Sequence, residues 1–279
     1  MSVNEVAHTV FYGRAGDPND LAMPGAKAIG EALARQSGIS PVFIGTPKPA
    51  LNGSWQQELD AAMPELRAMQ RRFEEVFRSK ALSVAATGRC VVSLATLPVV
   101  AKYHPGVCVV WFDAHADLNT PDVSASGYLG GMALAGPLGL WDSGLGSGLR
   151  PEQIVLVGQR DIDPSESLLI ARHNITCLQP GEGLAERLQQ AIGGRAVYVH
   201  LDCDVLEPGI VPTDYVIAGG LTLAELKGCC EVLACQPFVG IEIAEFQYCR
   251  EGQEDVVSPE PLLEALSPLL NRESELSRR

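Results

Sequence analysis

The chain has 279 residues, a hydrophobic content of 46% and a formal net charge of −13. The hydrophobic content supports a large buried core, and the acidic balance argues against a nucleic acid or an anionic membrane surface as a partner. The eight cysteines lack the short spacings of a secreted disulfide scaffold, the N-terminus lacks a signal-peptide pattern, and no apolar run reaches about 18 residues. These features predict a protein of the reducing cytoplasm.

Strand and helix patterns alternate along the chain without a linker-like break. Short apolar runs predict strands at residues 6–12, 41–44, 81–86, 107–112, 154–157, 196–201 and 239–245. Segments of helical period predict helices at residues 26–35, 55–79 with an interruption near Pro64, 91–102, around Met132, and at 168–173, 184–192, 223–233 and 259–270. The alternation predicts a single domain, residues 1–279, with a mostly parallel, doubly wound sheet and helices on both of its faces. The charged residues 271–279 are expected to form a frayed tail.

The predicted strand at residues 107–112 is followed by three side chains of the kinds that bind metal ions. Asp113, His115 and Asp117 are spaced two residues apart directly after this apolar run. Ligands of open α/β sheets bind at the carboxyl ends of the strands, so this spacing indicates a metal site there.

A second group of carboxylates follows the predicted strand at residues 196–201. Asp202 and Asp204 are again two residues apart, and a turn with Glu207-Pro208 comes next. Neighbouring buried carboxylates repel one another unless a cation compensates their charge. The two clusters together could hold two bridged ions, and an oxygen-rich ligand set with one imidazole favours Mn²⁺ or a similar divalent ion over a thiolate zinc site.

With a late strand that ends in Glu245, these motifs resemble the ureohydrolase superfamily, the arginases and agmatinases. The motifs are Asp113-Ala-His-Ala-Asp117, Asp202-Cys-Asp-Val-Leu-Glu-Pro208 and Gly240-Ile-Glu-Ile-Ala-Glu245, and the resemblance runs from Thr9 to Leu263. It implies an arginase-like three-layer α/β/α fold, two divalent metal ions, a small guanidino amino acid as the substrate, and a homotrimer or homohexamer.

The resemblance also implies roles for individual residues. The implied metal ligands are Asp113, His115, Asp117, Asp202, Asp204 and the residue at position 90. Asp113 and Asp202 would bridge the two ions, and a hydroxide between the ions would attack the guanidinium carbon, because coordination lowers the pKa of water. Asp117 and Glu245 are the implied catalytic residues, and Glu245 would pair with the planar guanidinium and orient it.

Position 90 departs from the family pattern. Members usually have a metal-binding histidine within a Gly-Gly-Asp-His-Ser motif, and this chain has Cys90 there. A thiolate suits softer ions than Mn²⁺, so two interpretations stay open: Cys90 is a ligand, or it is a small filler and water completes the coordination. His200, two residues before Asp202, is a further candidate for contact with the site, although an isolated histidine is more often structural.

The loop after the first metal motif keeps some substrate-binding residues of the arginases and lacks others. Asn119 and Ser126 are retained where such residues bind the α-carboxylate of the substrate. Tyr128 replaces an asparagine, and Gly130 replaces the histidine that is usually given a proton-shuttle role.

The segment Gly158–Glu166 favours an amino-acid substrate. It resembles the arginase loop in which two acidic residues, here Asp163 and Glu166, bind the α-amino group. The alternative is that Asp163 and Pro164 simply begin a helix, as its N-cap and first helical residue. The two roles are compatible.

The departures at positions 90 and 130 suggest a substrate that needs less assistance than arginine. In Nω-hydroxy-L-arginine the electron-withdrawing hydroxyl lowers the basicity of the guanidine, and the demands of acid–base catalysis shift with the pKa of the substrate. We therefore expect an amidinohydrolase that releases L-ornithine and hydroxyurea, as in the antibiotic-biosynthesis branch of the family. The alternatives are an ordinary arginase or another guanidino-acid hydrolase, and a metal-impaired homologue that acts as a binding or regulatory protein.

Overall fold

The computed structural model describes residues 5–253 and 255–271, and in this part of the chain eight strands form a single sheet. The strands are β1 (Val6–Phe11), β2 (Val42–Ile44), β3 (Leu82–Gly88), β4 (Cys108–Phe112), β5 (Ile154–Val157), β6 (Thr176–Leu178), β7 (Val197–Asp202) and β8 (Phe238–Ala244). Their order is β2-β1-β3-β8-β7-β4-β5-β6, and every pairing is parallel. The last two strands of the chain thus lie in the middle of the sheet.

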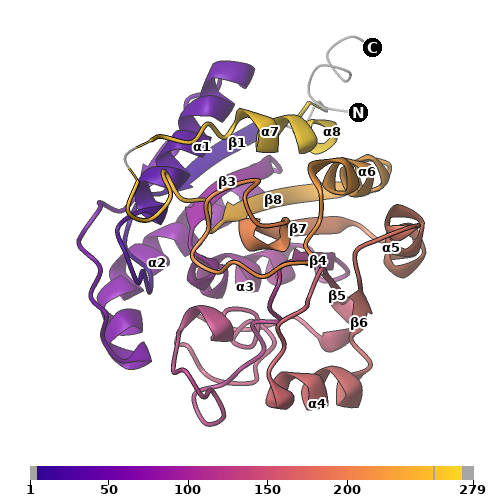
Figure 1. Ribbon diagram of the computed structural model, residues 1–279, viewed down its shortest axis with the longest axis horizontal. Coiled ribbons are helices and arrows are strands. Elements are labelled where there is room, and N and C mark those ends of the chain that lie inside the picture. Colours follow the sequence, from indigo (N-terminus) through magenta and orange to yellow (C-terminus); the bar gives the residue numbers. More distant parts are fainter. Residues whose placement is uncertain (1–4, 254, 272–279) are drawn as a thin grey trace.

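Helices cover both faces of the sheet and produce three layers (Figure 1). One face is covered by α1 (Ala22–Ser37), α5 (Leu184–Ile192), α6 (Leu223–Ala234), α7 (Glu260–Ala265) and α8 (Ser267–Leu270), and the other by α2 (Trp55–Arg78), α3 (Ser93–Tyr103) and α4 (Pro164–His173). Successive strand residues point to opposite faces, so Val110 belongs to one hydrophobic cluster and Trp111 to the other. The predicted three-layer α/β/α fold is confirmed.

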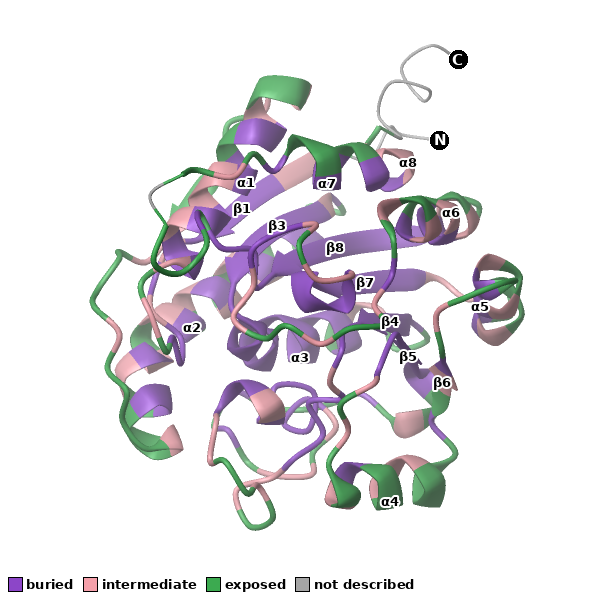
Figure 2. Ribbon diagram, viewed as in Figure 1, coloured by how far each residue is buried: buried purple, intermediate pink, exposed green. Residues whose placement is uncertain are grey.

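The central strands are buried on both faces, as Figure 2 shows for β3, β7 and β8. All residues of β4, β7 and β8 are buried, which explains why the sequence shows continuous apolar runs there rather than alternation. Because the strands are parallel, their carboxyl ends meet at one edge, where the polar side chains that follow them come together.

Three expectations about helices need correction. The predicted interruption of the second helix near Pro64 is wrong, because α2 continues through this residue. The stripe of α2 that contains Leu66, Met69 and Phe73 is fully buried, and this packing outweighs the hydrogen bond that proline cannot make. The predicted last helix is two helices, since α7 ends at Ala265 and α8 starts at Ser267. The segment around Met132 is a single 3₁₀ turn, Gly130–Met132.

Most of the C-terminal segment lies outside the described residues. Of the predicted tail 271–279, only Asn271 belongs to the described residues, where its N–H donates to the carbonyl of Ser267 at 2.9 Å. Among the helices of the described part, none combines the length and apolar character needed to cross a membrane.

Candidate active site

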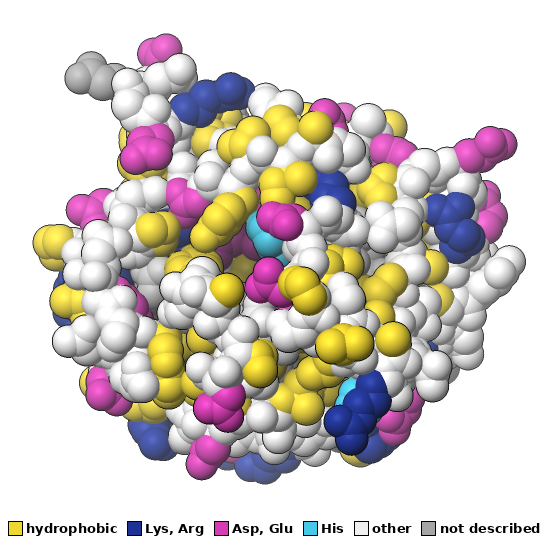
Figure 3. All heavy atoms as spheres, turned by 60° about the horizontal axis from the view of Figure 1, so that its bottom comes forward, with side chains coloured by type: hydrophobic (Ala, Val, Ile, Leu, Met, Phe, Trp, Pro, Cys, Tyr) yellow, Lys and Arg dark blue, Asp and Glu magenta, His cyan; other side chains and the backbone are white. Residues whose placement is uncertain are grey.

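The side chains predicted for the site lie together in a pocket at the carboxyl edge of the sheet. Its walls include the following predicted residues: Cys90, His115, Asp117, Asn119, Ser126, Asp163, Glu166, Asp202, Asp204 and Glu245. Asp113, which is 0% exposed, lies behind His115. The space-filling view shows a histidine with acidic side chains beside it in a hollow of the surface (Figure 3). Strands β3, β4, β7 and β8 each end at this pocket.

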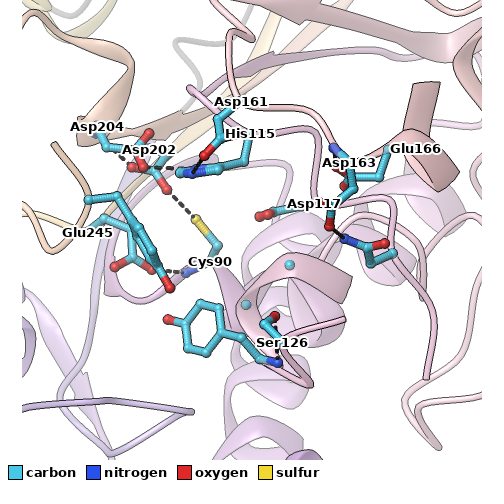
Figure 4. Close-up of a pocket in the computed structure, with 15 residues that line it drawn as sticks. Cys90, His115, Asp117, Ser126, Asp161, Asp163, Glu166, Asp202, Asp204 and Glu245 are labelled. Carbon is cyan, nitrogen blue, oxygen red and sulfur yellow. Dashed lines mark hydrogen bonds and ion pairs between the residues drawn. The ribbon is translucent and has the colours of Figure 1, made fainter. Parts of the chain in front are cut away.

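His115 connects the carboxylates of the two metal motifs. Its Nδ1 atom is 3.0 Å from Oδ2 of Asp204 (Figure 4) and 3.3 Å from Oδ1 of Asp113. Each of the three residues offers one potential metal-ligating atom, and these three atoms lie within 4.8 Å of one another. The N–H of Ala114 donates to the second oxygen of Asp204 at 3.0 Å and fixes its orientation. This trio could therefore hold a metal ion.

Cys90 lies on the other side of the site, in a 3₁₀ turn after β3. Its thiol donates to Oδ2 of Asp202 at 3.0 Å, and its N–H donates to Oε1 of Glu245 at 2.9 Å (Figure 4). Cys90, Asp202 and Glu245 form a second trio of donor atoms within 4.8 Å. Burial raises the pKa of the Cys90 thiol, and the charge of Asp202 adds to this effect.

The charges of the site fit divalent cations. Burial raises the pKa values of Asp113, Asp117 and Asp202, and repulsion between neighbouring carboxylates raises them further. Burial opposes ionisation of Asp204 as well, but the hydrogen bond and charge of His115 outweigh it and lower this pKa. A buried acidic group of this kind is costly to ionise unless cations compensate it, which agrees with a metal-binding donor set.

Two site residues have unusual backbone conformations. Asp117 has φ 52° and Glu245 has φ 61°, in the left-handed region that residues other than glycine seldom adopt. Such a conformation costs about 1–3 kcal/mol, and it persists where surrounding contacts impose it. At Asp117 these contacts are the N–H groups of Leu134 and Ala135, which donate to its carbonyl. Glu245 directly follows β8, Asp117 lies in the loop after β4, and both side chains line the pocket.

The acidic residues at the start of α4 have a structural function. Glu166 accepts hydrogen bonds from the N–H of Asp163 and from the N–H of Leu118, both at 2.9 Å. It therefore closes the first turn of α4, which has Pro164 at its start, and ties this helix to the loop after Asp117. Asn119 donates to Oδ2 of Asp163 at 2.7 Å. The helix-start interpretation is confirmed, and a role in substrate binding stays a prediction.

Tyr128 and Gly130 occupy the same part of the pocket. A Cβ atom at Gly130 would lie 2.3 Å from Cε1 of Tyr128. The tyrosine ring therefore fills the space that a side chain at position 130 would need. The two departures from the family pattern are coupled, and the histidine usual at position 130 does not fit beside this ring.

His200 is part of a buried polar network beneath Cys90 and does not line the pocket. Its Nε2 is 3.2 Å from Sγ of Cys90, its Nδ1 is 2.9 Å from Oε1 of Glu242, and its ring stacks on Trp111. Glu242 also accepts hydrogen bonds from three hydroxyl groups, those of Ser93, Thr96 and Tyr198. His200 thus contacts the site through Cys90. The sequence had favoured a purely structural histidine over one that contacts the site.

The sequence interpretation missed Arg89. This guanidinium is 1% exposed and forms ion pairs with Asp17, Asp214 and Glu245. The sequence did contain one indication, because Arg89 is a charged residue beside Cys90 in an otherwise apolar segment. Its partners Asp17 and Asp214 lie in separate loops, where no motif marks them.

Comparison with known proteins agrees with this architecture. The sequence profile of the arginase family matches residues 20–252. The chain belongs to the arginase family. The predicted family and the predicted metal-dependent ureohydrolase class are therefore confirmed.

Individual members of the arginase family match to different extents. The chain is 38% identical over 259 residues to the N(omega)-hydroxy-L-arginine amidinohydrolase of Streptomyces lavendulae, and this match covers 93% of the chain and 95% of that protein. It is 33% identical over 159 residues to an arginase of Staphylococcus aureus, which covers 51% of the chain and 52% of the arginase. The crystal structure of Entamoeba histolytica arginase in complex with L-ornithine has a TM-score of 0.83 at 21% identity, covering 96% and 99% of the two chains, and shows the shared fold.

Proposed function

We propose that this protein hydrolyses Nω-hydroxy-L-arginine to L-ornithine and hydroxyurea. The similarity to an enzyme named for this substrate, over nearly the full length of both chains, is the observation that carries the proposal. The pocket supports it, because Cys90 stands in place of the usual histidine and the Tyr128 ring excludes a histidine at position 130. A less basic guanidine needs less assistance from such groups.

The metal centre would use five predicted ligands, Asp113, His115, Asp117, Asp202 and Asp204. Cys90 would be either a sixth ligand or a small filler beside the ion, and all six residues come from the ends of β3, β4 and β7. Divalent ions held by these residues would supply a water-derived nucleophile at neutral pH and would stabilise negative charge on the reacting group. An oxygen-rich set favours Mn²⁺.

The other side chains would orient the substrate. Glu245 lies opposite the Asp163 side of the pocket, so the guanidine can face Glu245 while the α-amino group faces Asp163 and Glu166 (Figure 4). Asn119 and Ser126 would bind the α-carboxylate, and Ser126 is exposed at the rim, where a charged group can enter. A cytoplasmic location and assembly into a trimer or hexamer remain predictions from the sequence and its resemblance.

A steady-state comparison tests this proposal. Protein loaded with Mn²⁺ is assayed for ornithine release from L-arginine and from Nω-hydroxy-L-arginine, with Glu245→Gln as the inactive control. We expect kcat/KM to favour the hydroxylated substrate by about a hundredfold or more, which corresponds to about 2.7 kcal/mol in the activation barrier.

Either of two other results would contradict the proposal. Equal or faster turnover of arginine would identify an ordinary arginase. Absence of turnover, together with absence of bound metal by elemental analysis, would identify a binding protein instead.

A further inference from the structure

Arg89 is the feature of this site that metal binding does not explain. Its side chain is 1% exposed and lies directly behind Glu245, outside the pocket wall. Nε is 2.8 Å from Oδ1 of Asp17, and Nη1 is 2.7 Å from Oε2 of Glu245 and also contacts Asp214. The guanidinium is thus held on two sides by carboxylates and directs one N–H at the residue expected to orient the substrate.

Glu245 is already paired before a substrate arrives. Its Oε1 accepts from the N–H of Cys90 at 2.9 Å and its Oε2 accepts from Arg89. A carboxylate oxygen can accept a second hydrogen bond, so Glu245 can still orient an N–H group of a guanidine. A cation is thus already fixed within hydrogen-bond distance of its carboxylate, and Asp17 and Asp214 share this cation with Glu245.

We propose that Arg89 is a positioning residue that makes this site select an uncharged guanidine over a cationic one. The inference rests on the proposed function. A guanidinium bound to Glu245 would lie near the buried positive charge of Arg89, and charges repel strongly where water is excluded. The guanidinium of arginine keeps its proton under all ordinary conditions, whereas the N-hydroxyl group makes a guanidine less basic and allows it to bind in the neutral form.

Asp17 and Asp214 hold Arg89 in this position. The Asp17 side chain is 0% exposed and that of Asp214 is 13% exposed. Their negative charges compensate the cost of burying the guanidinium away from water, which a lone buried cation would bear in full. Since they contact Arg89 and do not line the pocket, they are available as controls.

L-canavanine separates charge from recognition of the hydroxyl group. Its side-chain oxygen lowers the basicity of the guanidine, and it carries no N-hydroxyl. If charge decides, wild-type protein loaded with Mn²⁺ should hydrolyse canavanine with a kcat/KM about tenfold or more above that for arginine. If canavanine is as poor a substrate as arginine, the site recognises the hydroxyl itself and the inference is wrong.

Substitution of Arg89 tests the residue directly. Arg89→Gln should lower the preference for Nω-hydroxy-L-arginine over arginine about tenfold or more, chiefly by lowering KM for arginine. Arg89→Lys keeps the charge and should restore the preference. The matched control Asp17→Asn removes one negative partner of Arg89 while Asp214 and Glu245 still hold it, so it should keep or increase the preference.

The outcomes distinguish this inference from the proposed function. If wild-type protein does not prefer the hydroxylated substrate, the proposed function fails. If it does, but a folded Arg89→Gln variant keeps the same preference, Arg89 is only structural. Should Arg89→Gln not fold, the double variant Arg89→Gln/Asp17→Asn removes one charge of each sign and is assayed in the same way. The canavanine comparison tests selection by charge, and the variants test the role of Arg89 in it.

Discussion

Gly130 is restricted by a neighbouring ring rather than by its own backbone. A Cβ at this position would lie 2.3 Å from the Tyr128 ring, and overpacking of this kind costs about 1–3 kcal/mol. We expect Gly130→Ala to lower the free energy of unfolding, measured by urea denaturation, by about this amount. Adding Tyr128→Asn should recover much of the loss. A single variant as stable as the wild type would show that the ring moves away freely.

Cys90 can be tested as a metal ligand without an activity assay. If its thiolate binds, protein loaded with Co²⁺ should show a sulfur-to-metal charge-transfer band in the near ultraviolet, and Cys90→Ser should lose it. Metal affinity should also fall about tenfold or more, since even outer-shell partners have effects of this size. Identical spectra and affinities would establish Cys90 as a filler, with water completing the coordination.

The predictability of the site depended on how its residues are spaced in the sequence. Asp113, His115 and Asp117 form one short motif, as do Asp202 and Asp204, and each motif follows an apolar run that marks a strand end. The Arg89 cluster gave no such motif, because Asp17 and Asp214 lie 72 and 125 residues from Arg89. Contacts of this range become visible only when the loops are placed in three dimensions.

At the scale of elements, buried strands were predictable and helix details were not. The strands β4, β7 and β8 were expected within one or two residues, because strands buried on both faces have continuous apolar sequences. β6 was missed because Thr176–Leu178 is short and lacks a run of β-branched apolar and aromatic residues, which the equally short edge strand β2 has. The rule that proline interrupts a helix also failed at Pro64, because the tertiary packing of α2 outweighs the effect of this residue.

The exposed Pro64 on α2 should reduce the stability of the protein. It lies in the helix interior, where proline lacks the N–H needed for a hydrogen bond to the carbonyl of Asp60. Pro64→Ala should therefore raise the free energy of unfolding by about 1–3 kcal/mol in urea denaturation. Arg71→Ala, exposed on the same helix, is the control and should change it by less than about 0.5 kcal/mol. A destabilised Pro64→Ala variant would contradict this expectation.

At the scale of the whole molecule, the acidic site should make stability depend on pH when metal is absent. Burial raises the pKa of Glu245 from 4.5 to about 7, although Arg89 partly opposes this shift. Between these values the folded protein keeps a proton that the unfolded chain has released, so the free energy of unfolding falls as pH rises. At about 1.4 kcal/mol per unit, the effect of this residue is on the order of 3 kcal/mol.

Other site residues act in the same direction, each above its own unfolded pKa. The pKa values of Asp113, Asp117 and Asp202 are also raised by burial, whereas the lowered pKa of Asp204 acts only below its unfolded value. Chelator-treated protein should therefore melt at a lower temperature at about pH 7.5 than at about pH 5.5, and divalent ions should restore stability at the higher pH. Equal melting temperatures at both pH values, without metal, would contradict this account.

The sheet order has a consequence for synthesis of the chain on the ribosome. β3 and β4 are separated in the sheet by β8 and β7, which are made last. Until residue 197 emerges, the nascent chain can form only two half-sheets, each with an unpaired inner edge that favours aggregation. A chain stopped after Arg195 should accordingly bind chaperones or precipitate, whereas a soluble, monodisperse fragment would argue otherwise. The enzyme thus becomes competent to bind metal only after the strands of both half-sheets have been made.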